Sequence, residues 1–158
     1  MRKLEAGVSD EELLRAVEEW VQLLVEKRYQ DAYNFLYHPW IPVAPNNDLS
    51  AEDIRGSVTN YGWDEPHPDG PFKVTPVEAA MPQEVPPQRD ICRYEQPQER
   101  AWDSILVQAG GVPSGASIVG SIHFDIPLDN MWSDLTAIFD IVLYNGATVL
   151  ALESIHVM

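Results

Sequence analysis

The side chains best suited to chemistry in this sequence are two carboxylates and a tyrosine near its C-terminal end: Asp140, Glu153 and Tyr144. General acid–base catalysis needs one carboxyl group protonated and another ionised, and an apolar cavity shifts their pKa values toward the working pH. Asp140 with Glu153, and Tyr144 beside them, therefore form the candidate catalytic group. The alternative is that both carboxylates are solvated, or hydrogen-bonded at the rim of an interface.

His123 and Asp125 form a second pair, two residues apart in a stretch where polar and apolar residues alternate. A carboxylate can orient an imidazole so that the ring acts as a base. The same alternation is typical of the solvent-facing side of a strand. We therefore keep His123 and Asp125 as candidate binding residues, with the solvated strand face as the alternative.

An acidic cluster follows the third predicted helix: Asp64, Glu65, His67 and Asp69. Carboxylate oxygens and imidazole nitrogens bind divalent ions, but this spacing matches no known metal motif. We expect a solvated turn here and no metal site. The sequence also lacks phosphate-binding loops, dinucleotide fingerprints and serine-hydrolase motifs, so we expect no cofactor.

Cys92 is the only cysteine. An intrachain disulfide is therefore excluded, which fits a reducing compartment. Arg89 and Arg93 could lower the pKa of its thiol, but no histidine partner for a nucleophile is evident. The first ten residues contain no apolar leader, and no apolar run approaches the roughly 20 residues of a spanning helix. The sequence predicts a cytoplasmic protein.

Charge is the strongest compositional signal. The chain has 10 Lys and Arg against 25 Asp and Glu, a formal net charge of −15. Such a surface repels phosphate groups and anionic lipids, so we expect no nucleic-acid partner and no membrane partner. It suits a basic protein partner, or serves solubility alone.

The 158 residues predict a single α+β domain. We expect helices over about residues 9–61, a proline-rich loop over about 62–100 and antiparallel strands over about 101–158. Ser9 with Glu12 makes a capping box at the start of the first helix. A short second helix is predicted over residues 31–37 and a third over 50–61, with Gly62 as the left-handed residue that ends it.

Eight of the thirteen prolines fall in residues 62–100. Because proline removes a backbone donor, this region can contribute only an edge strand, and Phe72–Ala80 is the best candidate. After residue 101 the pattern indicates strands, including Trp102–Ala109 and residues 118–129.

The last two predicted strands form a hairpin. Leu135–Tyr144 and Ala147–Val157 are joined by Asn145-Gly146, which predicts a two-residue type I′ turn. This turn sets the register, which pairs Tyr144 with Ala147, Val142 with Val149, Asp140 with Ala151 and Ile138 with Glu153.

The register gives the hairpin two faces. One is almost purely apolar, and we expect the first helix to pack on it, with His156 at its edge. The other carries the candidate carboxylates together with five apolar residues: Ile138, Val142, Tyr144, Val149 and Ile155. It is a partner or dimer interface, the lining of a pocket, or a surface covered by the proline-rich loop.

This order of elements resembles the cystatin-like group, and within it the nuclear transport factor 2-like superfamily. The stretch from Glu19 to Tyr33, where a helix ends at a basic residue before a second helix, is similar to the start of those proteins. The resemblance implies a curved antiparallel sheet. In the enzymes of that superfamily, paired carboxylates or a His with an Asp lie in a cone between sheet and helices.

A second resemblance covers about residues 50–158. Four stretches look like an uncharacterised bacterial domain family of unknown function: Ile54-Arg55 to Gly62, Trp102-Asp103, Trp132-Ser133-Asp134-Leu135-Thr136 and Ile155-His156-Val157. It implies a bacterial origin and brings no catalytic residues. The proline-rich segment departs from the compact pattern of that family.

Two functions follow as expectations. The first is a non-catalytic binding protein, of the type of a bacterial immunity protein that neutralises a basic toxin enzyme. Its contact residues would be Ile138, Val142, Tyr144, Val149, His123 and Asp125. The alternative is a nuclear transport factor 2-like enzyme or small-ligand binder that uses Asp140 and Glu153 in a pocket. A homodimer whose sheet faces pack together is a third possibility.

Overall fold

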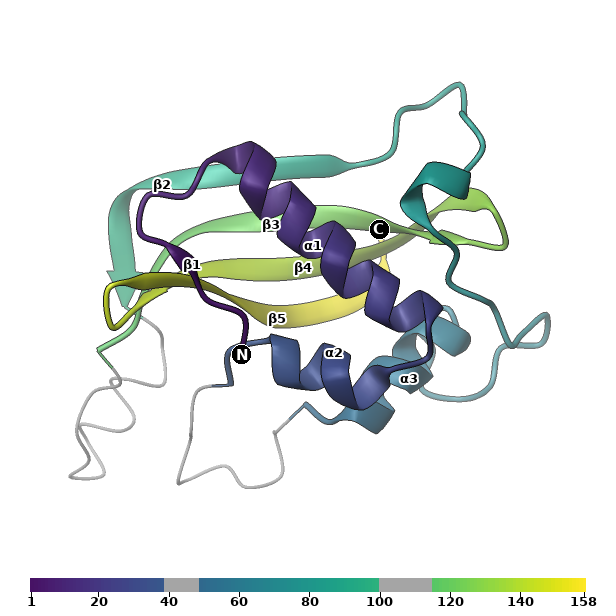
Figure 1. Cartoon of the computed structure of the whole chain (residues 1–158). Coiled ribbons are helices and arrows are strands. Elements are labelled where there is room, and N and C mark those ends of the chain that lie inside the picture. Colours follow the sequence, from purple (N-terminus) through teal and green to yellow (C-terminus); the bar gives the residue numbers. More distant parts are fainter. Residues whose placement is uncertain (39–48, 100–114) are drawn as a thin grey trace.

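The computed structural model describes residues 1–38, 49–99 and 115–158 and has an α+β architecture (Figure 1). Three N-terminal helices pack against a curled five-stranded antiparallel sheet of order β1-β5-β4-β3-β2. This confirms the predicted fold class and is consistent with a cystatin-like or nuclear transport factor 2-like architecture. The elements are β1 (Leu4–Glu5), α1 (Asp10–Val25), α2 (Tyr29–Phe35), α3 (Ala51–Thr59), a 3₁₀ helix (Val77–Ala79), β2 (Arg89–Glu99), β3 (Ser117–Leu128), β4 (Met131–Tyr144) and β5 (Ala147–Val157).

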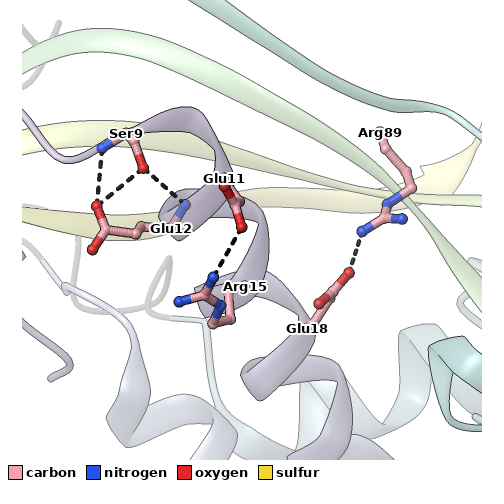
Figure 2. A network of polar contacts seen from close by, with 6 residues as sticks. All are labelled: Ser9, Glu11, Glu12, Arg15, Glu18 and Arg89. Carbon is pink, nitrogen blue, oxygen red and sulfur yellow. Dashed lines mark hydrogen bonds and ion pairs between the residues drawn. The ribbon is translucent and has the colours of Figure 1, made fainter.

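Helix α1 is fixed at its start and along its buried face. The Ser9 hydroxyl accepts a hydrogen bond from the Glu12 N–H, and the Glu12 carboxylate accepts one from the Ser9 N–H, which confirms the capping box (Figure 2). Trp20 is fully buried and stands edge-on to Phe139 of β4, with ring centroids 5.1 Å apart. On the outer side Glu18 pairs with Arg89, which ties the helix to edge strand β2 (Figure 2).

The edge strand predicted over Phe72–Ala80 lies elsewhere. Strand β2 occupies Arg89–Glu99, at the outer edge of the sheet. It contains Pro97 because the register against β3 shifts between Arg93 and Gln98, and a proline is tolerated at such an irregularity on an edge strand. The prediction that the proline-rich region contributes an edge strand is therefore confirmed, but the predicted position of that strand is wrong.

The C-terminal hairpin is confirmed with one correction. The pairs of Tyr144 with Ala147, Val142 with Val149 and Asp140 with Ala151 are present. Next to them the register shifts, because Phe139 faces Leu152 while Ile138 faces Ser154. The predicted pair of Ile138 with Glu153 is therefore wrong, and Glu153 is the extra residue of a bulge.

The bulge exchanges the faces of the residues that follow it. Ile155 packs against the main core under α1, although the uninterrupted register placed it on the opposite face. His156 faces Thr136, which lies on the side of the sheet away from that core. Both predicted placements are wrong for the same reason. Side chains alternate between the two faces of a strand, so one extra residue moves every later side chain to the opposite face.

The second face of the hairpin is closed by the chain that leaves α2. Val142, Val149 and Ala151 are buried there in a small cluster with Tyr37 and Ala116. The Tyr37 N–H donates to the Leu150 carbonyl at 2.7 Å, which holds this segment against β5. The pattern of the sequence did not predict this cover. The predicted strand Trp102–Ala109 lies outside the described residues.

Across the described ranges, none of the helices combines the length and apolarity needed to cross a membrane.

Candidate functional site

A cavity of about 720 Å³ lies at one end of the sheet, beside the β3–β4 turn. The end of α3, the proline-rich segment and the start of β4 complete it. We call it the acidic cleft. Its lining residues are Tyr61, Phe72, Gln83, Val85, Pro86, Pro87, Asp125, Leu128, Asp129, Met131, Trp132, Ser133 and Asp134.

The proline-rich wall of the acidic cleft is held in place by hydrogen bonds. Five of them join residues 73–83 to the end of β3, the β3–β4 turn and the start of β4: Thr75 N to Pro127 O (3.0 Å), Asp129 N to Lys73 O (2.9 Å), Asn130 N to Thr75 Oγ1 (3.1 Å), Met81 N to Asn130 O (2.9 Å) and Gln83 Nε2 to Trp132 O (2.7 Å). Prolines cannot donate, so the residues between them carry these bonds. The segment is therefore a wall of the cleft that hydrogen bonds hold in place, rather than a free surface loop.

The end of helix α3 brings Tyr61 to the cleft. The Gly62 N–H donates to the Ser57 carbonyl at 2.7 Å, a helix-ending turn whose middle residue is left-handed. That residue is Tyr61 (φ 56°), so the prediction of Gly62 needs correction, although Gly62 follows with a φ of 73°. A left-handed tyrosine carries a backbone cost that glycine would avoid. Its ring contact with Phe72, at 5.1 Å, and its hydrogen bond to Asp134 offset that cost.

Three carboxylates line the acidic cleft, and they are not equivalent. Asp125 accepts hydrogen bonds from the Gln88 N–H (2.7 Å) and the Thr136 hydroxyl (2.6 Å), so it is already engaged in holding the sheet. Asp129 and Asp134 are exposed. Among the described lining residues there is no Lys or Arg, and the cleft therefore presents uncompensated negative charge.

The mouth of the acidic cleft is apolar. Val85 and Met131 line it with 75% and 50% of their surface exposed, and Met81, which bridges to Met131, is 54% exposed. Trp63 is 53% exposed two residues beyond Tyr61. Large apolar side chains gathered in this way mark a contact surface for another molecule. A site with this lining can accept a cationic group that is surrounded by apolar groups.

The Tyr61 hydroxyl is expected to ionise far above the range of an ordinary tyrosine. Burial, and then the hydrogen bond to Asp134, raise its pKa to about 12. Because the folded-state pKa lies above the unfolded value of about 10, this group stabilises the fold below that pH and loses its contribution as the pH rises through 12. A difference ultraviolet titration of the wild type against Tyr61→Phe should show a phenolate midpoint of about 12. Asp134→Asn should lower that midpoint, and a wild-type midpoint near that of a solvated tyrosine, about 10, would contradict the contact.

The residues singled out for catalysis do not line this cleft. Glu153 is exposed at the bulge of β5, Asp140 is half-buried, and Tyr144 packs beside Tyr37 with ring centroids 4.8 Å apart. The described lining of the acidic cleft includes none of Asp140, Glu153 and Tyr144.

The residues singled out for binding are divided between core, sheet surface and cleft. Val142 and Val149 are fully buried, whereas Ile138 is half-buried. His123 and Asp125 are not joined by a hydrogen bond in the described part of the chain. The Nδ1 atom of His123 is buried without a partner there, while Asp125 reaches the acidic cleft.

The other two candidate sites can be placed as well. No group of three or more metal-ligating side chains occurs among the described residues, and the ring of His67 lies against Trp63 and Phe72, with centroids 4.8 and 5.2 Å apart. Cys92 is exposed on β2.

Sequence reasoning missed Tyr61, Asp129, Trp132 and Asp134 as site residues. In the sequence, Tyr61 is only the last residue of the third predicted helix, and Trp132 and Asp134 enter only through the resemblance to a family without known activity. The one local signal for Tyr61 is that this bulky residue directly precedes Gly62, at the end of the helix.

No protein-family model, no curated protein and no solved structure matches this chain.

Proposed function

We propose that this protein is a non-catalytic acidic binding protein whose acidic cleft receives a cationic side chain of a basic protein partner. The observation that carries the proposal is the lining of the cleft: carboxylates and aromatic rings, with no Lys or Arg among its described residues. The partner's own contribution would be an arginine or lysine set among apolar residues.

Arginine suits this lining best. Its planar guanidinium can stack on an aromatic ring and, at the same time, donate hydrogen bonds to a carboxylate. Trp132 and Tyr61 offer the rings, and Asp129 and Asp134 offer the carboxylates. The net charge of −15 would add long-range attraction, which raises the association rate with a basic partner and discriminates against acidic ones.

The biological setting is part of the proposal. A bacterial immunity-type protein, cytoplasmic and directed against a basic toxin enzyme, has the charge and the non-catalytic role described. The acidic surface supports this setting, because a basic toxin enzyme would be its electrostatic complement. Self-association as a homodimer is the competing use of the same apolar mouth, and light scattering separates the two.

The enzyme alternative has less support. It requires Asp140 and Glu153 inside one apolar cavity. Glu153 is exposed, and the described lining of the acidic cleft contains neither carboxylate. The acidic cleft, rather than this pair, is therefore the site on which the proposal rests.

Calorimetric titration with a capped glycyl-arginyl-glycine tripeptide tests the proposal directly. The arginine peptide is expected to bind, and the same peptide with uncharged citrulline is not. The double variant Asp129→Asn/Asp134→Asn should weaken binding by about tenfold or more, because two carboxylates that face the cation are lost.

A matched variant controls for net charge. Glu5→Gln/Glu95→Gln also removes two negative charges, from exposed positions on β1 and β2 rather than from the lining of the acidic cleft. It should change the affinity by less than about twofold. If both double variants lost the same affinity, or if citrulline replaced arginine without loss, the cleft would not be the site.

A further inference from the structure

A second cavity of about 360 Å³ lies where the end of α1, the start of α2, the body of α3 and residues 71–74 meet. Its lining differs in charge from that of the acidic cleft. Three of its described lining residues are cationic, Lys27, Arg55 and Lys73, and none is acidic. We call it the basic pocket. In a chain with 25 acidic and 10 basic residues, a cavity of this charge is unexpected.

The two lysines of the basic pocket have no carboxylate partner among the described residues. Every arginine of the described chain pairs with a carboxylate: Arg2, Arg15, Arg28, Arg55, Arg89 and Arg93. Lys27 and Lys73 form no ion pair within the described ranges, although the surface is rich in Asp and Glu. Arg55 is compensated by Glu52, so two positive charges remain available at this pocket.

The backbone holds Lys27 in a fixed position. The Lys27 N–H donates to Leu24 O (2.9 Å) and the Arg28 N–H to Leu23 O (2.8 Å), which together end α1 in a Schellman turn. Lys27 takes the left-handed position of that turn, with a φ of 57°, where glycine is usual. A lysine kept in a strained conformation at a pocket wall suggests a role for its side chain.

A neutral donor accompanies the two lysines. Tyr29 lines the same pocket, and its hydroxyl makes no hydrogen bond to the described residues. Burial raises the pKa of Tyr29, against a smaller opposing effect of Arg55, so the hydroxyl keeps its proton at neutral pH. Below these donors the wall is apolar and includes the buried side chains of Leu24 and Val74 and the half-buried ring of Phe72.

We propose that the basic pocket binds an organic carboxylate that carries an apolar chain. The carboxylate would lie with the ammonium groups of Lys27 and Lys73 and the hydroxyl of Tyr29, and the chain would rest on Leu24 and Phe72. A carboxylate can accept hydrogen bonds from both ammonium groups and neutralises one of the two lysine charges, and the apolar floor requires a hydrocarbon body. The basic pocket differs from the acidic cleft in charge and in ligand, although the ring of Phe72 lines both cavities.

Octanoate is the probe that tests this inference. It is titrated into the full chain, and its binding is measured by calorimetry and by the shifts of amide resonances. Octanoate is expected to bind with a Kd on the order of 1 mM or below and to shift resonances of residues 24–29, 55–59 and 72–74. Acetate lacks the chain and 1-octanol lacks the charge, so each should bind at least about tenfold more weakly.

The variant Lys27→Gln/Lys73→Gln should weaken octanoate binding by about tenfold or more, while circular dichroism confirms that these exposed changes leave the fold intact. Lys3→Gln is the control, since Lys3 also lacks an ion pair in the described chain but does not line the pocket. Absence of octanoate binding overturns the inference. So does equal binding of 1-octanol or acetate, or an equal loss in the Lys3 variant.

Discussion

Replacement of Trp20 by alanine is expected to lower the free energy of unfolding by about 3–5 kcal/mol. Trp20 has no exposed surface and stands edge-on to Phe139, so its loss leaves a cavity between α1 and the sheet. Its indole Nε1 also donates to the Ala32 carbonyl at 3.1 Å, a buried acceptor that the variant would leave without this donor. Urea denaturation at equilibrium measures the change.

Trp63→Ala is the matched control. Its side chain is 53% exposed, and most exposed substitutions change stability by no more than about 0.5 kcal/mol. Similar losses in the two variants would show that Trp20 does not join α1 to the sheet in the way described.

Gly120→Ala is expected to cost about 2–3 kcal/mol, the second-largest effect. An added Cβ at Gly120 would lie 2.4 Å from the Cys92 carbonyl oxygen of the neighbouring strand β2, and backbone cannot yield as a flexible side chain can. The same Cβ would press on Ile141 Cδ1 at 3.1 Å. The expected result is a weakened pairing of β2 with β3, seen as lower stability and faster hydrogen exchange in β2.

Gly56→Ala is the matched control, because it is the same glycine-to-alanine substitution at another position. Gly56 lies inside α3 with nothing within 4 Å of an added Cβ. Alanine is the better helix former, so this variant should gain about 0.5–1 kcal/mol. Opposite signs for the two glycines are therefore the expected result. A loss in both, or in neither, would contradict the close approach of β2 to Gly120.

Short sequence motifs correctly predicted the elements whose formation depends on neighbouring residues in the chain. The capping box at Ser9 begins α1, and Asn145-Gly146 turns β4 into β5 with the expected register next to the turn. Each of these depends on residues within a few positions of one another. The helix-bearing face of the hairpin followed from the same period of two.

The features that sequence reasoning missed depend on distant parts of the chain. Nothing near Glu153 signals a bulge, yet that one residue inverts the faces beyond it. Tyr37 covers the second face of the sheet only because the chain leaving α2 passes the edge of β5. A pattern along one segment carries no information about such contacts.

The acidic cleft was missed for the same reason. Its lining comes from the end of α3, from the proline-rich segment and from both sides of the β3–β4 turn. The composition did predict an acidic surface suited to a basic partner, but it did not predict where that charge meets exposed apolar side chains. The cleft is where both properties coincide, and for this reason it carries the proposed function.

A titration of amide resonances with the capped arginine tripeptide tests that claim most directly, because it locates the ligand. We expect the largest shifts at Tyr61, at Asp129 and over residues 131–134, and we expect them to disappear in Asp129→Asn/Asp134→Asn. The acidic first turn of α1, Asp10 to Glu12, should change little. Shifts of equal size at α1 and at the cleft would instead mean that the peptide follows the diffuse negative charge of the surface, and the cleft would then have no special role.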